Sequence, residues 1–310
     1  MSLFLGIDTS NYTTSVALSE NGVIVKNCKL PVYVKAGERG ARQSDAVFSH
    51  VKNLPEVMAM VGKVRPDAIG VSLRPRDVEG SYMPCFLAGY GLASSLATMF
   101  DVPLYTFSHQ AGHVRAAMYS SGCSELVSEK LLAFHVSGGT TEVLLYDNGK
   151  IECVGATNDI NAGQLIDRIG VKLGLQFPCG KELEALADFA AMKTEGLIPM
   201  TSVMGLSCNL SGLENKAEQY LKRGASYGAV SAFVLASVEK TLTKLCDAAI
   251  ATYGKLPVLF SGGVSSNRYL QKQLGARFGA YFAEPAFSAD NAAGTALLCQ
   301  ERYEQCHKTD

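Results

Sequence analysis

Two of the five histidines lie four residues apart, at His109 and His113. On a helix this spacing places both imidazoles on one face, as in known metal-binding pairs. A metal there needs a third ligand, and spacing alone does not choose among Asp167, Asp290 and His135. The competing interpretation is an incidental histidine pair on a packed or solvated helix. The pattern therefore indicates a candidate metal site with two assigned ligands.

Two strand–turn–strand segments, residues 8–13 and 137–141, are rich in hydroxyl side chains, and the second also contains a glycine pair. Glycine lets a phosphate approach the backbone closely, and the N–H groups and hydroxyls of such turns suit anions. Each segment alone is more typical of an ordinary hairpin rich in turn residues. Their equivalent places in two halves of the chain favour phosphate binding. In the first segment the candidate contacts are Asp8, Thr9, Ser10 and Thr13.

A third glycine-containing segment, Ser261-Gly262-Gly263, follows an apolar run and precedes an expected helix that begins near Asn267. A base or ribose fits against a helix N-terminus of this kind.

Hydrophobic periodicity places these residues on two similar halves. Apolar and alternating runs predict the strands, and longer runs with a helical period predict the helices. The expected strands are 3–8, 13–18, 23–30, 68–73, 103–107, 131–136, 141–146, 151–155, 257–260 and one near 281. The expected helices are 46–61, 86–99, one from 109, 160–173, 182–192, 227–253, one from 267, and 291–300.

Three antiparallel strands followed by helix, strand, helix, strand and helix, written twice, resembles the α/β fold of the actin, Hsp70 and sugar-kinase (ASKHA) superfamily. That resemblance implies two RNase H-like lobes with a nucleotide cleft between them. We expect the lobes to comprise residues 1–127 and 128–310, with the last helix a candidate to pack back on the first lobe. Residues 194–215 form the least regular stretch.

The charge balance limits the partners of the chain. Its 310 residues include 28 Lys and Arg against 29 Asp and Glu, a formal charge of −1. A nucleic-acid contact therefore needs a local basic patch or a partner protein. No apolar run is long enough to span a membrane, so we expect no membrane partner. The nine cysteines are scattered without a C-x-x-C pair, which favours reduced thiols and a cytoplasmic location.

Seven ordered segments together resemble the TsaD family of tRNA threonylcarbamoyl-adenosine synthases, once described as O-sialoglycoprotein endopeptidases. The resemblance extends over nearly the whole chain. Its segments are residues 6–10, the H-x-E-G-H-like residues 109–113, Val136-Ser137-Gly138-Gly139, residues 161–167, Phe177-Pro178-Cys179-Gly180, residues 261–267 and residues 288–293.

The resemblance implies an acyltransferase that moves a threonylcarbamoyl group from threonylcarbamoyl-adenylate to the N6 amine of the adenosine beside the tRNA anticodon. It implies one divalent metal ion, iron or zinc, held by His109, His113 and Asp290. ATP, AMP or the adenylate itself would be the nucleotide ligand. The implied partners are tRNA and the other subunits of the TsaD system. The implied nucleotide and substrate contacts are His135, Val136, Ser137, Gly138, Gly139, Asp167, Gly180 and Asn267.

The chain departs from the family pattern at four places. Ala111 replaces the glutamate between the histidines, and Thr140 replaces a histidine after Ser-Gly-Gly. Arg74-Pro75-Arg76 replaces a Gly-Pro-Gly segment, and residues 11–13 replace acidic ones. These differences keep open a second hypothesis, a non-catalytic nucleotide-binding paralogue that acts as a regulatory or scaffold subunit. A metallopeptidase is disfavoured, because its H-E-x-x-H motif needs a glutamate where this chain has Gln110.

Overall fold

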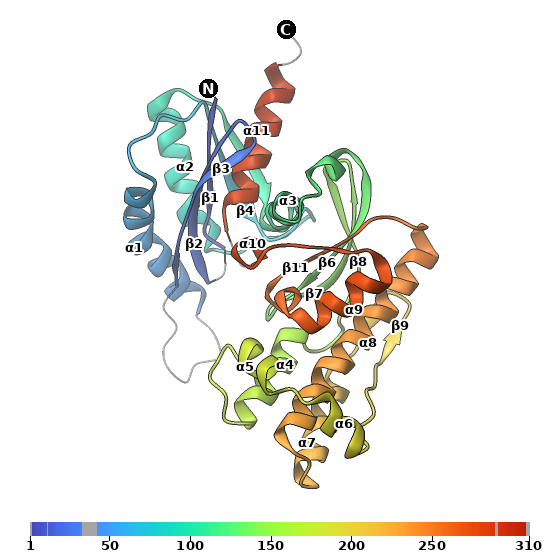
Figure 1. Cartoon of the computed structure of the whole chain (residues 1–310). Coiled ribbons are helices and arrows are strands. Elements are labelled where there is room, and N and C mark those ends of the chain that lie inside the picture. Colours follow the sequence, from blue (N-terminus) through green and yellow to red (C-terminus); the bar gives the residue numbers. More distant parts are fainter. Residues whose placement is uncertain (1, 11, 33–41, 289–290, 308–310) are drawn as a thin grey trace. The chain divides into compact units, whose positions relative to one another are not determined.

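A computed structural model describes residues 2–10, 12–32, 42–288 and 291–307 (Figure 1). The chain divides into two compact units, which we call unit 1 (Met1–Ser120 with Ala289–Asp310) and unit 2 (Ser121–Ser288). The division expected from the sequence, 1–127 and 128–310, differs in its boundary, which lies at residue 120. The last helix belongs to unit 1, in line with the expectation that it packs back on the first lobe.

Unit 1 is built on a five-stranded mixed sheet of order β3-β2-β1-β4-β5. Strands β1, β2 and β3 are antiparallel neighbours, and β1, β4 and β5 are parallel. The strands are β1 (Leu3–Asp8), β2 (Thr13–Glu20), β3 (Val23–Pro31), β4 (Ala68–Arg74) and β5 (Leu104–Ser108). The helices are α1 (Gln43–Val61), α2 (Phe86–Phe100), α3 (His109–Ser120) and α11 (Ala293–His307).

The central strand β1 shows why helices cover both faces of this sheet. Successive side chains of a strand point to opposite faces. Leu5 and Ile7 pack in one core with residues of α1 and α2, whereas Phe4 packs with Cys299 of α11. A Cβ at Gly6 would lie 2.5 Å from the backbone nitrogen of Ala296, so glycine lets α11 lie directly on the strand.

Unit 2 repeats the topology. Its five-stranded sheet has the order β12-β11-β6-β7-β8, with β6, β7 and β8 antiparallel and β6, β11 and β12 parallel. The strands of this sheet are β6 (Lys130–Val136), β7 (Thr141–Asp147), β8 (Lys150–Ala156), β11 (Val258–Ser261) and β12 (Tyr281–Phe282). The helices are α4 (Ala162–Lys172), α5 (Gly180–Leu186), α6 (Phe189–Thr194), α7 (Ser211–Lys222), α8 (Tyr227–Tyr253), α9 (Arg268–Phe278) and α10 (Pro285–Ser288), with 3₁₀ turns η1 (Ser124–Ser128) and η2 (Gly263–Ser266).

The long helix α8 forms the centre of the unit 2 core. Residues 229–238 of α8 are all buried, and they pack with Leu132, Phe134 and the apolar faces of α4 and α9. Figure 1 shows α8 running beside α9 and α7. Among the described helices, none combines the length and apolar character that crossing a membrane requires.

Most expected elements are confirmed, and two expectations are corrected. The helix predicted over 182–192 is two helices, α5 and α6. The break lies at Asp188, whose carboxylate accepts hydrogen bonds from the N–H groups of Ala190 and Ala191 at 2.9 Å and so begins a new helix. The irregular stretch 194–215 contains a short hairpin, β9 (Val203–Met204) with β10 (Ser207–Cys208), and the start of α7.

Candidate functional site

The two histidines of the candidate metal site lie in α3, in unit 1. Their ring centroids are 4.3 Å apart and the ring planes are inclined by 81°. His113 is buried, and the His109 side chain is 17% exposed. Asp290, the expected third ligand, lies outside the described residues. Within the described part of the chain, no set of three His, Cys, Asp or Glu side chains is grouped closely enough to hold a metal.

The start of α3 is held by the segment that precedes it in the sheet. Ser108 Oγ accepts a hydrogen bond from the N–H of Ala111 at 3.1 Å and donates one to Asp77 at 2.8 Å. Asp77 also pairs with the Arg74 guanidinium at 2.7 Å. Arg74 and Asp77 therefore help to orient the turn on which His109 lies.

A buried carboxylate, Asp8, contacts the first histidine of the pair. Its Oδ2 lies 2.9 Å from Nδ1 of His109 and accepts a hydrogen bond from Ser72 Oγ at 2.6 Å. Its Oδ1 accepts hydrogen bonds from the Ser10 N–H at 2.8 Å and from the Ser10 hydroxyl. Burial alone would raise the pKa of Asp8, but His109 and the hydroxyl donors lower it below the ordinary value. Asp8 is thus an ionised anchor for the imidazole.

The other side chains of the first candidate phosphate segment also face inward. Thr9 and Ser10 are buried. The Thr9 hydroxyl donates to the carbonyl of Cys85 and accepts from the N–H of Gly89, both at 3.0 Å, which docks the turn on α2. Thr13 begins β2, and its N–H donates to the Ser10 carbonyl at 3.3 Å. Most of the polar groups that suggested a phosphate loop therefore form hydrogen bonds within unit 1.

The two glycine-containing segments of unit 2 lie together. Strands β6 and β11 are parallel with Ser261 opposite His135, so the segments that follow them leave the same edge of the sheet. Gly262 has a φ of +91°, and a Cβ there would lie 2.9 Å from Cδ2 of His135. A side chain at this position is excluded by conformation and by space.

The segment 137–139 is closed by its own serine. Ser137 Oγ accepts hydrogen bonds from the N–H groups of Gly139 at 3.2 Å and Thr140 at 3.1 Å. Gly138 is exposed, and no described residue accepts a hydrogen bond from its N–H. This N–H could therefore donate a hydrogen bond to a bound anion.

The N-terminus of α4 packs directly on this segment. The N–H of Gly163 donates to the Ser137 carbonyl at 3.1 Å, and the Asn161 side chain donates to the Gly139 carbonyl at 3.0 Å. A Cβ at Gly163 would lie 2.6 Å from the backbone nitrogen of Gly138, so a side chain there would force the backbone to move. The shape of the 137–139 segment therefore depends on glycine at position 163.

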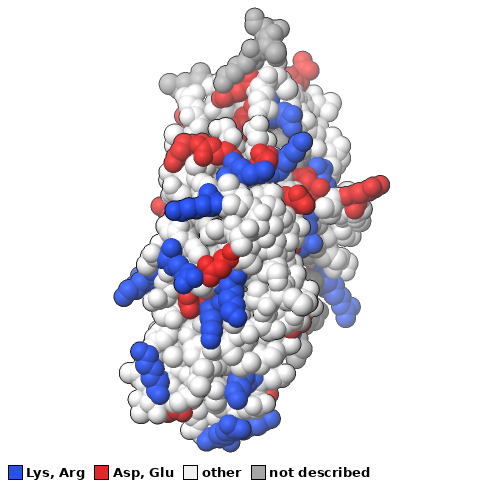
Figure 2. Space-filling model, turned by 90° about the vertical axis from the view of Figure 1, so that its right-hand side faces the viewer, with Lys and Arg blue, Asp and Glu red and all other residues white. Residues whose placement is uncertain are grey.

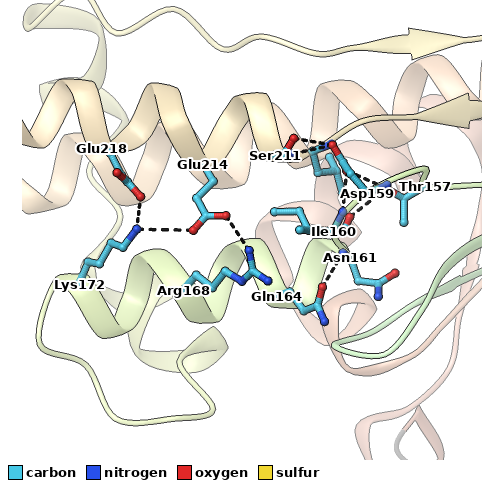
Figure 3. A network of polar contacts seen from close by, with 11 residues as sticks. Thr157, Asp159, Ile160, Asn161, Gln164, Arg168, Lys172, Ser211, Glu214 and Glu218 are labelled. Atoms are coloured by element: carbon cyan, nitrogen blue, oxygen red, sulfur yellow. Dashed lines mark hydrogen bonds and ion pairs between the residues drawn. The ribbon is translucent and has the colours of Figure 1, made fainter. Parts of the chain in front are cut away.

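Asp159, just before α4, ties this region to the hairpin segment (Figure 3). Its carboxylate accepts hydrogen bonds from the N–H groups of Ile160 at 2.6 Å and Leu210 at 2.8 Å, and from Ser211 Oγ at 2.6 Å. Burial opposes the charged form, but these donors lower the pKa of Asp159 well below its ordinary value. Figure 3 also shows ion pairs between α4 and α7, in which Arg168 pairs with Glu214.

Three further predicted contacts belong to unit 2. Oδ1 of Asp167 accepts a hydrogen bond from the N–H of Cys179 at 2.8 Å, and burial raises the pKa of Asp167. Gly180 begins α5 with open space where a Cβ would be. Asn267 is buried, and its side-chain oxygen caps α9 by accepting from the Leu270 N–H at 3.0 Å. The Asp167 and Asn267 side chains therefore each have a structural partner in addition to any ligand.

Two residues that shape the site were not among the predicted site residues. Ser72 contacts Asp8 from a neighbouring strand, and no local pattern marks it. Gly163 lies in a segment of the family resemblance but was assigned no role. The sequence signal that could have pointed to Gly163 is the capping box of Asn161 and Gln164. An Asn followed three residues later by Gln marks a helix start, and Gly163 lies in that first turn.

The two sheets and their connections define a known class of fold, that of the actin and sugar-kinase superfamily, as expected from the sequence. Full-length HypF in its phosphate- and nucleotide-bound form is similar with a TM-score of 0.64 and 13% identity, over 98% of this chain and 56% of the HypF chain. The ROK hexokinase of Thermus thermophilus is similar with a TM-score of 0.51 and 14% identity, over 98% of this chain and 99% of the hexokinase.

The chain belongs to the TsaD family, described as tRNA N6-adenosine threonylcarbamoyltransferase. The family model matches residues 59–297. A tRNA N6-adenosine threonylcarbamoyltransferase of Thermus thermophilus is 30% identical over 97% of this chain and 93% of its own length. The resemblance inferred from the ordered motifs is confirmed.

Proposed function

We propose that this chain is a transferase that moves a threonylcarbamoyl group from threonylcarbamoyl-adenylate to the N6 amine of an adenosine in tRNA. In this reaction the amine nitrogen bonds to the carbamoyl carbon, the bond from that carbon to the phosphate oxygen breaks, and AMP and one proton leave. The observation that carries the proposal is the family match over most of the chain. The adenosine beside the anticodon is the acceptor that the family resemblance implies.

The histidine pair fits a divalent metal ion, iron or zinc. Metal-ligating histidines usually give their second ring nitrogen to a carboxylate, which fixes ring and tautomer. Asp8 takes Nδ1 of His109 in this way at 2.9 Å, so Nε2 would coordinate the metal. His113 and Asp290 would complete the ligand set. When bound, the ion would supply Lewis-acid polarisation of the substrate carbonyl.

The residues of unit 2 would hold the adenylate. The N–H of Gly138, from which no described residue accepts a hydrogen bond, supports a phosphate contact, alongside His135, Val136, Ser137 and Gly139. One oxygen of Asp167 already holds the start of α5, and the other would accept from a ribose hydroxyl beside Gly180. Asn267 uses its oxygen as a helix cap, so its amide group would meet the adenine. Preorganised N–H groups of this kind stabilise charge that develops on the leaving phosphate.

A transfer assay tests the proposal. The chain would be loaded with iron or zinc and supplied with threonylcarbamoyl-adenylate and tRNA, together with the partner proteins that the family resemblance implies. We expect labelled threonine to enter tRNA, and His109→Ala to abolish the transfer. His307→Ala is the matched control, because it removes an exposed histidine at the end of α11. Transfer by His109→Ala at the wild-type rate would contradict the metal assignment.

Binding measurements separate transfer from simple nucleotide binding. We expect a non-hydrolysable threonylcarbamoyl-adenylate analogue to bind more tightly than AMP, and only to the metal-loaded protein. Equal binding of both nucleotides, unaffected by metal, would contradict the transferase proposal. Cytoplasmic location and TsaD-system partner subunits stay predictions from the sequence.

A further inference from the structure

One face of unit 2 carries exposed cations on neighbouring helices. We call it the α8–α9 face, and it comprises Lys193, Lys240, Lys244, Arg268 and Lys272, all exposed. Lys240 and Lys244 are one turn apart on α8, and Arg268 and Lys272 are one turn apart on α9. Arg277 of α9 pairs with Asp247 of α8 at 2.8 Å, so the outer surfaces of the two helices adjoin.

The five cations of this face have no carboxylate partner among the described residues. The nearby acidic side chains are occupied elsewhere. Glu184 accepts from the backbone N–H of Arg268 at 2.7 Å, Glu195 accepts from the Ser226 hydroxyl at 2.6 Å, and Glu239 accepts from the Thr243 hydroxyl at 2.8 Å. The five cations outnumber these three carboxylates, so the face keeps a net positive charge.

The segment that carries four of the five cations is more basic than the chain as a whole. Residues 211–278 contain nine Lys and Arg against four Asp and Glu, although the chain as a whole has a formal charge of −1. Figure 2 shows blue side chains outnumbering red ones over the lower part of the view, where unit 2 lies. The local basic patch that an RNA contact requires is present here.

An open groove of about 480 Å³ adjoins the cations, and its lining includes Lys193, Lys240, Phe189, Tyr269 and Gln273. The rings of Phe189 and Tyr269 stack with centroids 4.3 Å apart. Aromatic rings beside cations are the features that single-stranded RNA uses for stacking and phosphate contact.

We propose that the α8–α9 face binds the sugar-phosphate backbone of the RNA acceptor. The proposal rests on the proposed function, because it assumes an RNA substrate. An acidic peptide seated in the groove would meet Lys193 and Lys240, which line it. Lys244, Arg268 and Lys272 lie outside the groove lining. The row of cations is therefore longer than the groove and suits a ligand with negative charges along its whole length. This distribution favours RNA over a peptide.

The test is tRNA binding by the whole chain across a range of salt concentrations, measured by fluorescence anisotropy. The variant is the double substitution Lys244→Gln and Lys272→Gln. Each lost phosphate contact lowers the salt slope by about one, so we expect a slope smaller by about two and affinity about tenfold weaker at 0.1 M salt. The control is Lys52→Gln with Lys63→Gln, two exposed lysines of unit 1, which should bind tRNA like the wild type.

Wild-type affinity and slope in the Lys244→Gln, Lys272→Gln variant, with AMP binding intact, would overturn the proposal. So would a variant that binds tRNA normally but loses binding to a polyglutamate probe, since that result assigns the face to an acidic protein. The two proposals fail separately. A wild-type chain that binds tRNA through this face without transferring threonine contradicts only the proposed function.

Discussion

Replacement of Gly163 by alanine tests whether the helix N-terminus shapes the 137–139 segment. The new Cβ would lie 2.6 Å from the nitrogen and 2.7 Å from the Cα of Gly138, so backbone must move. Such overpacking costs about 1–3 kcal/mol of folding free energy. The displaced segment is also the proposed phosphate contact, so the affinity for AMP should fall. Urea unfolding and calorimetric AMP titration measure the two effects.

Gly212→Ala is the matched control. Gly212 is the second residue of α7, as Gly163 is of α4, and a Cβ there would contact nothing within 4 Å. Alanine should stabilise that helix by about 0.5–1 kcal/mol, because glycine loses more backbone entropy on folding. The two variants should therefore differ by about 1.5–4 kcal/mol. Gly163→Ala with the stability and AMP affinity of Gly212→Ala would refute the steric argument.

Three other perturbations follow from the same structure. Asp8→Asn should weaken zinc binding about 10–100-fold in competition with a chelator, because the imidazole loses its carboxylate, and unchanged affinity would contradict that role. The folded-state pKa of Asp159 is lowered, so its stabilisation holds above its ordinary pKa of 3.8 and is lost as pH falls below it. Asp159→Ala should cost about 0.5–2 kcal/mol at pH 7 and flatten this acid dependence in urea unfolding. Of the nine thiols, exposed Cys153 and Cys306 should react first with a thiol reagent, whereas Cys246, whose pKa is raised by burial, should react only on unfolding.

The order of strands and helices along the chain was accessible from the sequence because burial leaves a strong periodic signal, and the fold class followed from the resemblance of that order to the ASKHA superfamily. The apolar run of β1 and the repeated antiparallel hairpins predict the two mixed sheets that the structure contains. The break between α5 and α6 was not accessible. Apolar periodicity continues through it, and Asp188 is held partly by its N–H, which donates to the Gly228 carbonyl 40 positions away at 2.9 Å.

The candidate site was predictable only where its residues lie close together in the sequence. The spacing of His109 and His113 shows that their rings share a helix face, and the structure has them adjacent. The polar turn at residues 8–10 was predicted to bind phosphate, but its side chains face inward. Their partners Ser72 and Cys85 lie 64 and 76 residues away from the groups they contact. Contacts of such separation leave no local pattern.

The two units differ in when their chains become complete on the ribosome. Unit 2 is one continuous segment, whereas the unit 1 sheet receives α11 from the far end of the chain. Residue 293, where α11 begins, follows residue 120 by 173 positions, or roughly 9–35 s of synthesis at about 5–20 residues per second. Until then Phe4 and Gly6 lack the helix that covers them. Unit 1 therefore cannot complete its fold until the residues of unit 2 have been synthesised.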